Sequence, residues 1–151
     1  MLLSHLLTPQ RIRVPIVGTD KASVLRELVE AVSDHDRDQV EDLLEAVRER
    51  EAVLSTGVGY GVALPHGRSP SVEDLRVSAG VAPGPIAYDS LDGEPVRLFF
   101  LLVGPESEAG AHVKALSRIT RLVRQLPLRE RLLQARSAEE FHRYLREAEG
   151  L

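Results

Sequence analysis

The sequence contains no cysteine and no tryptophan, and its 151 residues include only three phenylalanines and three tyrosines. The absence of cysteine excludes disulfides, thiolate metal sites and cysteine nucleophiles in this chain. The scarcity of aromatic rings argues against a surface that stacks nucleic-acid bases. Lysines and arginines number 19 against 23 aspartates and glutamates, which gives a net charge of −4. We therefore expect no nucleic acid as the main partner of this mildly acidic chain.

Long hydrophobic runs are also missing. The longest one, residues 98–103, has the length of a strand, whereas a membrane span needs about 20 apolar residues. Residues 1–7 lack the basic region and the small-residue cleavage site of a signal peptide. These observations predict a cytoplasmic protein without direct membrane insertion. The hydrophobic fraction of 43% is high enough for a core, and the length suits one domain over residues 1–151.

Apolar residues in alternation or in short runs predict four strands. The first covers residues 11–17, and Pro15 within it is typical of an edge strand. Residues 96–103 are apolar almost throughout, which predicts a central strand covered on both faces. The other two strands are expected at residues 61–64 and 77–81.

Apolar residues at intervals of three and four predict four helices. The pair Thr19–Asp20 can cap the first helix, and the second begins near Asp36. The third begins near Glu108, and Pro127 ends or kinks it. The fourth follows the capping box Ser137–Glu140. Because helices lie before, between and after the strands, an α/β fold with a mixed sheet and helices on both faces is expected.

The stretch VLSTGVGYGVALPHGRSP, residues 53–70, has three glycines at alternate positions and then Pro-His-Gly-Arg. Such glycines let the backbone approach a ligand closely and permit positive φ angles. A dinucleotide-binding loop would need the spacing GxGxxG at the start of a helix, and a Walker loop would need Gly-Lys-Ser/Thr. Neither pattern is present. A plain surface turn with a solvated histidine is the remaining simple interpretation.

Two features favour phosphate chemistry at His66 over a plain turn. Pro65 stiffens the backbone on one side and Gly67 removes side-chain bulk on the other. An imidazole there would be exposed and held in place, as a nucleophile requires. Arg50 precedes the segment and Arg68 follows it, and guanidinium groups bind phosphate oxygens in pairs. The residues therefore predict a histidine that accepts a phosphoryl group beside fixed positive charge.

The stretch around His66 is part of a pattern that runs over most of the chain. The pattern comprises Arg50-Glu51, Ser55-Thr56-Gly57, Gly59, Gly61, Ala63-Leu-Pro-His-Gly67 and residues 84–105 and 112–123. Together these segments resemble the IIA components of the sugar phosphotransferase system, of the mannitol/fructose and nitrogen-regulatory type. The resemblance extends from about residue 4 to about residue 147.

The resemblance implies a three-layer α/β/α sandwich with a mixed β-sheet. It also implies that His66 accepts phosphate on Nε2 from HPr, or from the nitrogen-branch relative of HPr, and passes it to a IIB partner. Arg50 and His112 match the family's active-site arginine and second histidine, which orient the phosphate and hydrogen-bond it. No cofactor and no metal are expected, since a zinc site needs three or four ligands at recognisable spacing. The predicted phosphate-site loop comprises Ser55, Thr56, Gly57, Gly59, Gly61, Pro65, Gly67 and Arg68.

Several alternatives stay open at this point. The same histidine would serve a nitrogen-related regulatory protein, whose phosphorylation state controls its binding to transporters or kinases. A catalytically dead relative is disfavoured by the intact set of Arg50, His66 and His112. Taken alone, His112 could be an exposed histidine at the start of a helix. Tyr60 stands where smaller polar residues are common, and it could alter docking at the rim of the site.

Other candidate residues have simpler interpretations. His5, His35 and His142 have no partner motif and are expected on the surface. The C-terminal third is rich in arginine. Its arginines are expected on solvated helix faces balanced by glutamates, and a docking face for an acidic partner is the other interpretation.

Overall fold

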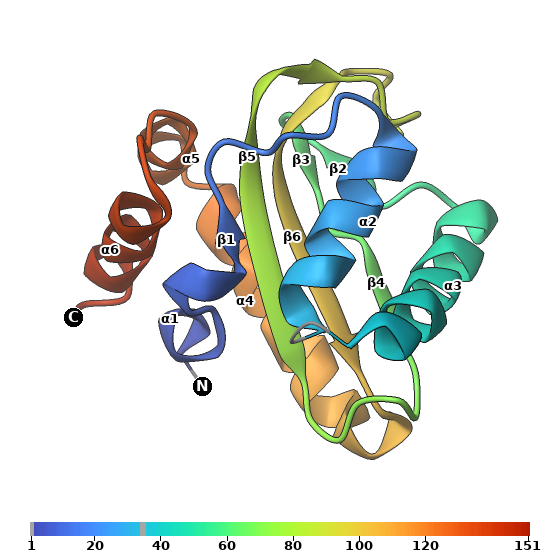
Figure 1. The fold of residues 1–151 in the computed structure, drawn as a ribbon. Helices are drawn as coiled ribbons and strands as arrows, with labels where there is room; N and C mark the ends of the chain where they lie inside the picture. Colours follow the sequence, from blue (N-terminus) through green and yellow to red (C-terminus); the bar gives the residue numbers. More distant parts are fainter. Residues whose placement is uncertain (1, 34–35) are drawn as a thin grey trace.

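A six-stranded mixed sheet forms the centre of the computed structural model, which describes residues 2–33 and 36–151 (Figure 1). The strand order is β1-β5-β6-β3-β2, and β4 pairs with β6 beside β3. Strand β6 is antiparallel to β5 and parallel to β3 and β4, while β1 is parallel to β5. The strands are β1 (Ile12–Arg13), β2 (Gly57–Gly59), β3 (Val62–Ala63), β4 (His66–Arg68), β5 (Arg76–Ile86) and β6 (Val96–Gly104).

Strand β6 is the central strand that the apolar run predicts. Every residue of it is buried except Arg97, which is partly exposed, because strands pair with it on both sides and helices cover both faces. The first strand lies at the edge of the sheet, as Pro15 predicts, but it ends at Arg13. Proline has no N–H to continue the ladder, so the strand is shorter than residues 11–17.

The helices lie on both faces of the sheet. Figure 1 shows α2 and α3 together on one face and α4 on the opposite face. Helices α1, α5 and α6 pack on the same side as α4. The helical segments are α1 (Leu3–Leu6), η1 (Pro9–Arg11), α2 (Lys21–Val32), α3 (Arg37–Val53), η2 (Glu106–Glu108), α4 (Ala109–Val123), α5 (Leu126–Leu133) and α6 (Ala138–Ala148). Within residues 2–33 and 36–151, no helix is long and apolar enough to cross a membrane.

Two hydrophobic clusters fill the space on either side of the sheet. Alternate side chains of β6 contribute to each: Leu98 and Phe100 pack with α4, α5 and α6, whereas Phe99 and Leu101 pack with α2 and α3. This division follows from the two-residue period of a strand. It confirms the three-layer α/β/α sandwich.

The capping residues act largely as the sequence predicts. The carboxylate of Asp20 accepts the N–H of Ser23 at the start of α2, and the Ser137 hydroxyl accepts the N–H of Glu140 at the start of α6. The Glu140 carboxylate, however, accepts the N–H of Arg136 rather than that of the capping serine. The last helix therefore has the N-cap but not the reciprocal bond of a capping box.

The predicted third helix is divided into α4 and α5. Pro127 lies in the first turn of α5, where a missing N–H leaves no helical bond unmade. Two of the apolar residues in this segment are exposed, Val113 by 59% and Leu126 by 51%. Val113 lies outside the buried face of α4, which includes Ala115 and Ile119. Apolar spacing alone thus does not bury Val113, and its side chain borders the pocket described next.

Candidate active site

An open pocket of about 510 Å³ lies between β4, the last turn of α3 and the first turns of α4. We call it the site pocket. Arg50, His66, Arg68 and His112 line it together with Gly67, so five of the predicted site residues meet in one place. Pro65 directly precedes His66 in the chain and is buried. Three segments far apart in the sequence thus contribute side chains to one hollow.

Gly67 lets this pocket form. Strand β4 packs directly against α3, and a Cβ atom on Gly67 would lie 2.9 Å from the carbonyl carbon of Ala46 and 3.0 Å from the amide nitrogen of Val47. Backbone atoms of a helix do not move aside for a side chain. Glycine is therefore required here for close approach, and that approach places the last turn of α3 beside His66.

His66 lies in a short strand and not in an exposed loop, which corrects the expectation from sequence. Its backbone pairs with Leu102 of β6, and its side chain is partly buried. The sequence could not show this, because the strand has only three residues and exists through its pairing with β6. The imidazole is held more firmly than a loop would hold it.

One ring nitrogen of His66 has a fixed partner. Nδ1 lies 2.8 Å from the carbonyl oxygen of Leu64. A carbonyl oxygen only accepts, so Nδ1 carries the hydrogen and Nε2 keeps its lone pair. Burial lowers the pKa of His66, and the charges of Arg50 and Arg68 lower it further. The ring is therefore neutral at pH 7, with Nε2 available as a nucleophile.

His112 is buried in the first turns of α4, which rules out the interpretation of an exposed helix-start histidine. Its ring meets that of His66 edge to face, with centroids 5.4 Å apart. Burial lowers the pKa of His112 to about 4, with smaller contributions from His66 and Arg68. Its Nδ1 atom is buried and has no hydrogen-bond partner within residues 2–33 and 36–151. A neutral ring with a free polar atom thus lies against His66.

Two guanidinium groups supply positive charge. Arg50 lies in the last turn of α3, and its Nη1 donates to the carbonyl oxygen of Leu54 over 2.7 Å. Arg68 follows His66 on β4 and forms an ion pair of 3.0 Å with the exposed carboxylate of Glu106. Each guanidinium has five N–H donors, so both groups keep donors for an anion in the pocket.

Gly57, Gly59 and Gly61 of the predicted loop do not line the site pocket, unlike Gly67. Gly59, Tyr60 and Gly61 all have positive φ angles, of 97°, 59° and 71°, between β2 and β3. Glycine adopts such angles without strain, whereas Tyr60 adopts them as a non-glycine residue. The tyrosine ring is 62% exposed and stacks under the Arg129 guanidinium, 4.8 Å from ring centroid to Cζ.

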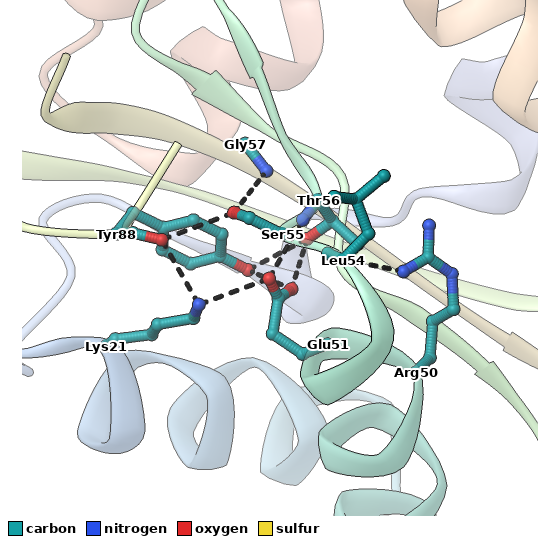
Figure 2. Close-up of polar contacts among 8 residues, drawn as sticks. All are labelled: Lys21, Arg50, Glu51, Leu54, Ser55, Thr56, Gly57 and Tyr88. Carbon is teal, nitrogen blue, oxygen red and sulfur yellow. Dashed lines mark hydrogen bonds and ion pairs between the residues drawn. The ribbon is translucent and has the colours of Figure 1, made fainter. Parts of the chain in front are cut away.

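Ser55 and Thr56 do not line the site pocket either. The hydroxyl of Ser55 donates to the carbonyl oxygen of Tyr88 and accepts the N–H of Gly57. Thr56 is buried, and its hydroxyl bonds the carboxylate of Glu51. Both side chains therefore fasten the segment between α3 and β2 to its neighbours, as Figure 2 shows.

Glu51 belongs to the pattern that carries the family resemblance, but the sequence assigned it no role. Its carboxylate accepts the N–H of Thr56 over 2.8 Å and the hydroxyl of Tyr88 over 2.9 Å, and it pairs with Lys21 over 3.1 Å (Figure 2). Burial by itself would raise the pKa of Glu51, but these donors outweigh it and hold the pKa below its usual value. One signal in the sequence indicates that Glu51 is buried. It lies four residues after Val47, on the same apolar face of α3.

The remaining histidines lie away from the site pocket. His5 is exposed, and the ring of His142 lies 2.8 Å from the carbonyl oxygen of Ser4 through Nε2. His35 lies outside the described residues. In the part of the chain that the structure describes, no group of three or more histidine, aspartate or glutamate side chains is placed to hold a metal ion.

A family model described as "Phosphoenolpyruvate-dependent sugar phosphotransferase system, EIIA 2" matches residues 5–148. The chain belongs to this EIIA family. The match includes all three central residues of the site, Arg50, His66 and His112. The resemblance inferred from the sequence is therefore confirmed, at the level of the family.

Relatives within the EIIA family carry two kinds of name. A nitrogen regulatory protein of Bradyrhizobium diazoefficiens is 34% identical, over 96% of this chain and 95% of its own length. The fructose-specific EIIABC component of Bacillus subtilis is 33% identical, over 92% of this chain but only 22% of that longer protein. The crystal structure of nitrogen regulatory protein IIA-Ntr from Neisseria meningitidis superimposes with a TM-score of 0.87 at 31% identity, over 95% of this chain and 98% of the other.

Proposed function

We propose that this protein is a phosphoryl carrier of the phosphotransferase system. It accepts a phosphoryl group on Nε2 of His66 from HPr, or from a carrier that resembles HPr, and passes it to a IIB partner. The observation that carries the proposal is the state of His66: its Nδ1 is bonded to Leu64, which leaves Nε2 unprotonated beside two guanidinium groups. No cofactor and no metal take part, and the protein works in the cytoplasm, where it meets a soluble donor.

The chemistry is an exchange between two histidines. The lone pair on Nε2 of His66 attacks phosphorus, a new nitrogen–phosphorus bond forms, and the bond to the donor histidine breaks. The electron pair of the broken bond returns to the donor ring. The hydrogen on Nδ1 stays bonded to the Leu64 carbonyl throughout, so the imidazole keeps its orientation. In the delivery step the thiolate of the IIB cysteine attacks phosphorus, a sulfur–phosphorus bond forms, and the electron pair of the broken bond returns to Nε2 of His66.

Charge on the moving phosphoryl group is met by the two arginines. Arg50 and Arg68 both line the pocket next to His66, and their planar forks match the spacing of phosphoryl oxygens. His112 is neutral at pH 7 because its pKa is about 4. A neutral ring can donate one N–H to a phosphoryl oxygen without adding charge. These three residues orient the group while His66 forms the bond.

Uptake of phosphate tests the proposal. The protein is incubated with phosphoenolpyruvate, enzyme I and HPr, and its intact mass is measured. We expect the mass of one phosphoryl group to be added, in a linkage that is labile in acid and stable in base. The His66→Ala variant should fold and add nothing. A variant that still takes up phosphate on histidine would contradict the assignment.

A regulatory role is the second candidate, and a specific observation favours it. The Bradyrhizobium diazoefficiens relative that matches this chain almost end to end is named a nitrogen regulatory protein. In that case the phosphorylation state of His66 controls whether this protein binds a target such as a transporter or kinase. Transfer from the phosphorylated protein to the cysteine of a fructose-type IIB domain separates the two roles. Rapid transfer supports the sugar pathway, and its absence in a protein that is phosphorylated normally supports regulation.

A further inference from the structure

We propose that Glu51 is a positioning residue for phosphoryl transfer, because it fixes the segment on which both Arg50 and His66 depend. The inference rests on the proposed function and goes beyond it. Glu51 does not line the site pocket, so it acts through other residues. The network around it is shown in Figure 2.

The carboxylate of Glu51 joins four parts of the fold. It belongs to α3 and its side chain is only 6% exposed. Thr56 reaches it from the start of β2, Lys21 from the start of α2, and Tyr88 from the loop after β5. Lys21 also lies over the Tyr88 ring, 4.4 Å from its centroid, and donates to the Tyr88 carbonyl oxygen over 3.1 Å. Both carboxylate oxygens are occupied by donors, so the group is held without freedom to turn.

The first connection leads to Arg50. Its Nη1 is bonded to the carbonyl oxygen of Leu54, the residue immediately after α3. Leu54 itself is exposed. The next two residues are fastened, Ser55 to the Tyr88 carbonyl and Thr56 to Glu51. The guanidinium of Arg50 is therefore placed by a carbonyl whose position depends on the Thr56 contact.

The second connection leads to His66. The carbonyl oxygen of Thr56 accepts the N–H of Leu64 over 2.9 Å. The carbonyl oxygen of the same Leu64 lies 2.8 Å from Nδ1 of His66. A shift of Thr56 would thus be passed to the carbonyl that sets the tautomer and direction of the reacting ring. One carboxylate connects to both reactive groups through one threonine.

A buried ion pair is weak evidence for stability, because the cost of removing two charges from water offsets most of their attraction. The Glu51 carboxylate is buried, with the partly exposed Lys21 as its ion-pair partner, and Glu51 directly follows Arg50 of the site pocket. A displacement of about 1 Å in a reacting group can slow a reaction about 100-fold. The geometry therefore points to placement of the site as the role of this network.

Glu51→Gln is the first variant, because it keeps the size of the side chain and removes the charge. An amide nitrogen does not accept a hydrogen bond, so the Gln side chain loses a contact to Thr56 or Lys21. Ser78→Ala is the matched control. It removes a buried hydrogen bond from Ser78 to the Leu28 carbonyl, between β5 and α2 and away from the pocket. Urea unfolding curves show the conditions under which both variants are folded, and transfer is assayed under those conditions.

The transfer assay from phosphorylated HPr distinguishes placement from stability. We expect Glu51→Gln to lower the rate at saturating donor by about 10-fold or more, with less than a twofold change in the donor concentration at half-maximal rate. Ser78→Ala should transfer as fast as wild type. In an Arg50→Ala background the Glu51→Gln change should slow transfer less, because part of its effect runs through Arg50. Wild-type transfer by Glu51→Gln, or the same loss in both backgrounds, would overturn the inference.

Nitrogen NMR of His66 provides a readout that does not depend on transfer. In wild type and Ser78→Ala we expect one tautomer, with the hydrogen on Nδ1. In Glu51→Gln we expect a mixture of tautomers, because the Leu64 carbonyl is less well fixed. An unchanged single tautomer would overturn the connection to His66. If wild type takes up no phosphoryl group at all, the proposed function fails, while this spectrum still decides whether Glu51 positions the ring.

Discussion

The rings of His66 and His112 meet edge to face, with centroids 5.4 Å apart and planes inclined by 66°. One ring comes from a strand and the other from the helix that covers the opposite face of the sheet from α3. His112 is buried, and burial lowers its pKa to about 4. Burial also lowers the pKa of His66. The pair therefore offers two uncharged imidazoles to a strongly charged group, and several measurements follow from this arrangement.

The His112→Ala variant should leave His66 reactive but slow its phosphorylation by about 10-fold, the value of one hydrogen bond to a charged group. Removing the neighbouring ring also admits water to His66, so the pKa of His66 should rise toward its ordinary value. Rapid-quench transfer and NMR titration measure the two effects. His142→Ala, which alters a histidine on α6, is the control. Identical titration curves and rates in wild type and His112→Ala would remove His112 from the site.

The pH dependence of stability should show the burial of His112. Its pKa is about 4 in the folded protein and near 6.5 when unfolded. Between these values the unfolded chain binds more protons, so the free energy of unfolding falls as the pH decreases from 6.5 to 4. Between pH 6.5 and 4, we expect the free energy of unfolding of His112→Gln to fall by about 2 kcal/mol less than that of wild type. Urea titrations at several pH values measure it, and parallel curves for the two proteins would contradict the burial.

Arg50 should contribute far more to transfer than to stability. Arg50 lines the site pocket, and its guanidinium donates to the carbonyl oxygen of Leu54. Arg50→Ala should slow transfer by about 3 kcal/mol in activation free energy, as when one preorganised donor is lost from an oxyanion site. Arg50→Lys should recover part of the rate, because an ammonium lacks the planar fork. Wild-type rates in both variants would leave Arg50 as a helix-end cation without a role in transfer.

Gly67 should tolerate no side chain. Gly67→Ala places a Cβ atom within 3.0 Å of backbone atoms of α3. We expect a loss of about 2 kcal/mol or more in the free energy of unfolding, because β4 must move away from the helix. Gly110→Ala on α4 is the matched control, since its Cβ would meet no atom within 4 Å. Helix propensity should make that variant as stable as wild type or more so. Equal stability of the two variants would contradict the close packing.

Apolar periodicity was sufficient to predict the helices that cover the sheet. The stripe of α3 and the unbroken run of β6 are long enough to show their period, and both are buried as expected. Strands β2 and β4, with three residues each, are too short to show a period. Their pairing depends on partners distant in the sequence, so His66 was expected in a loop.

The candidate site was predictable in its residue types and less so in its geometry. The flanking Pro65 and Gly67 pointed to His66, the nearby Arg50 and Arg68 pointed to phosphate, and the family resemblance added His112. Neither signal could show that His112 is buried, which depends on how α4 lies against the sheet. The role of Glu51 was hidden for the same reason, since its three partners come from three other segments.

The position of the phosphoryl group on the imidazole of His66 tests the central claim most directly. The phosphorylated protein, labelled with nitrogen-15, is examined by phosphorus–nitrogen NMR. Since Nδ1 is bonded to the Leu64 carbonyl, the account predicts coupling of phosphorus to Nε2 of His66, with a hydrogen retained on Nδ1. Phosphorus on Nδ1 of His66, or on any other residue, would contradict it.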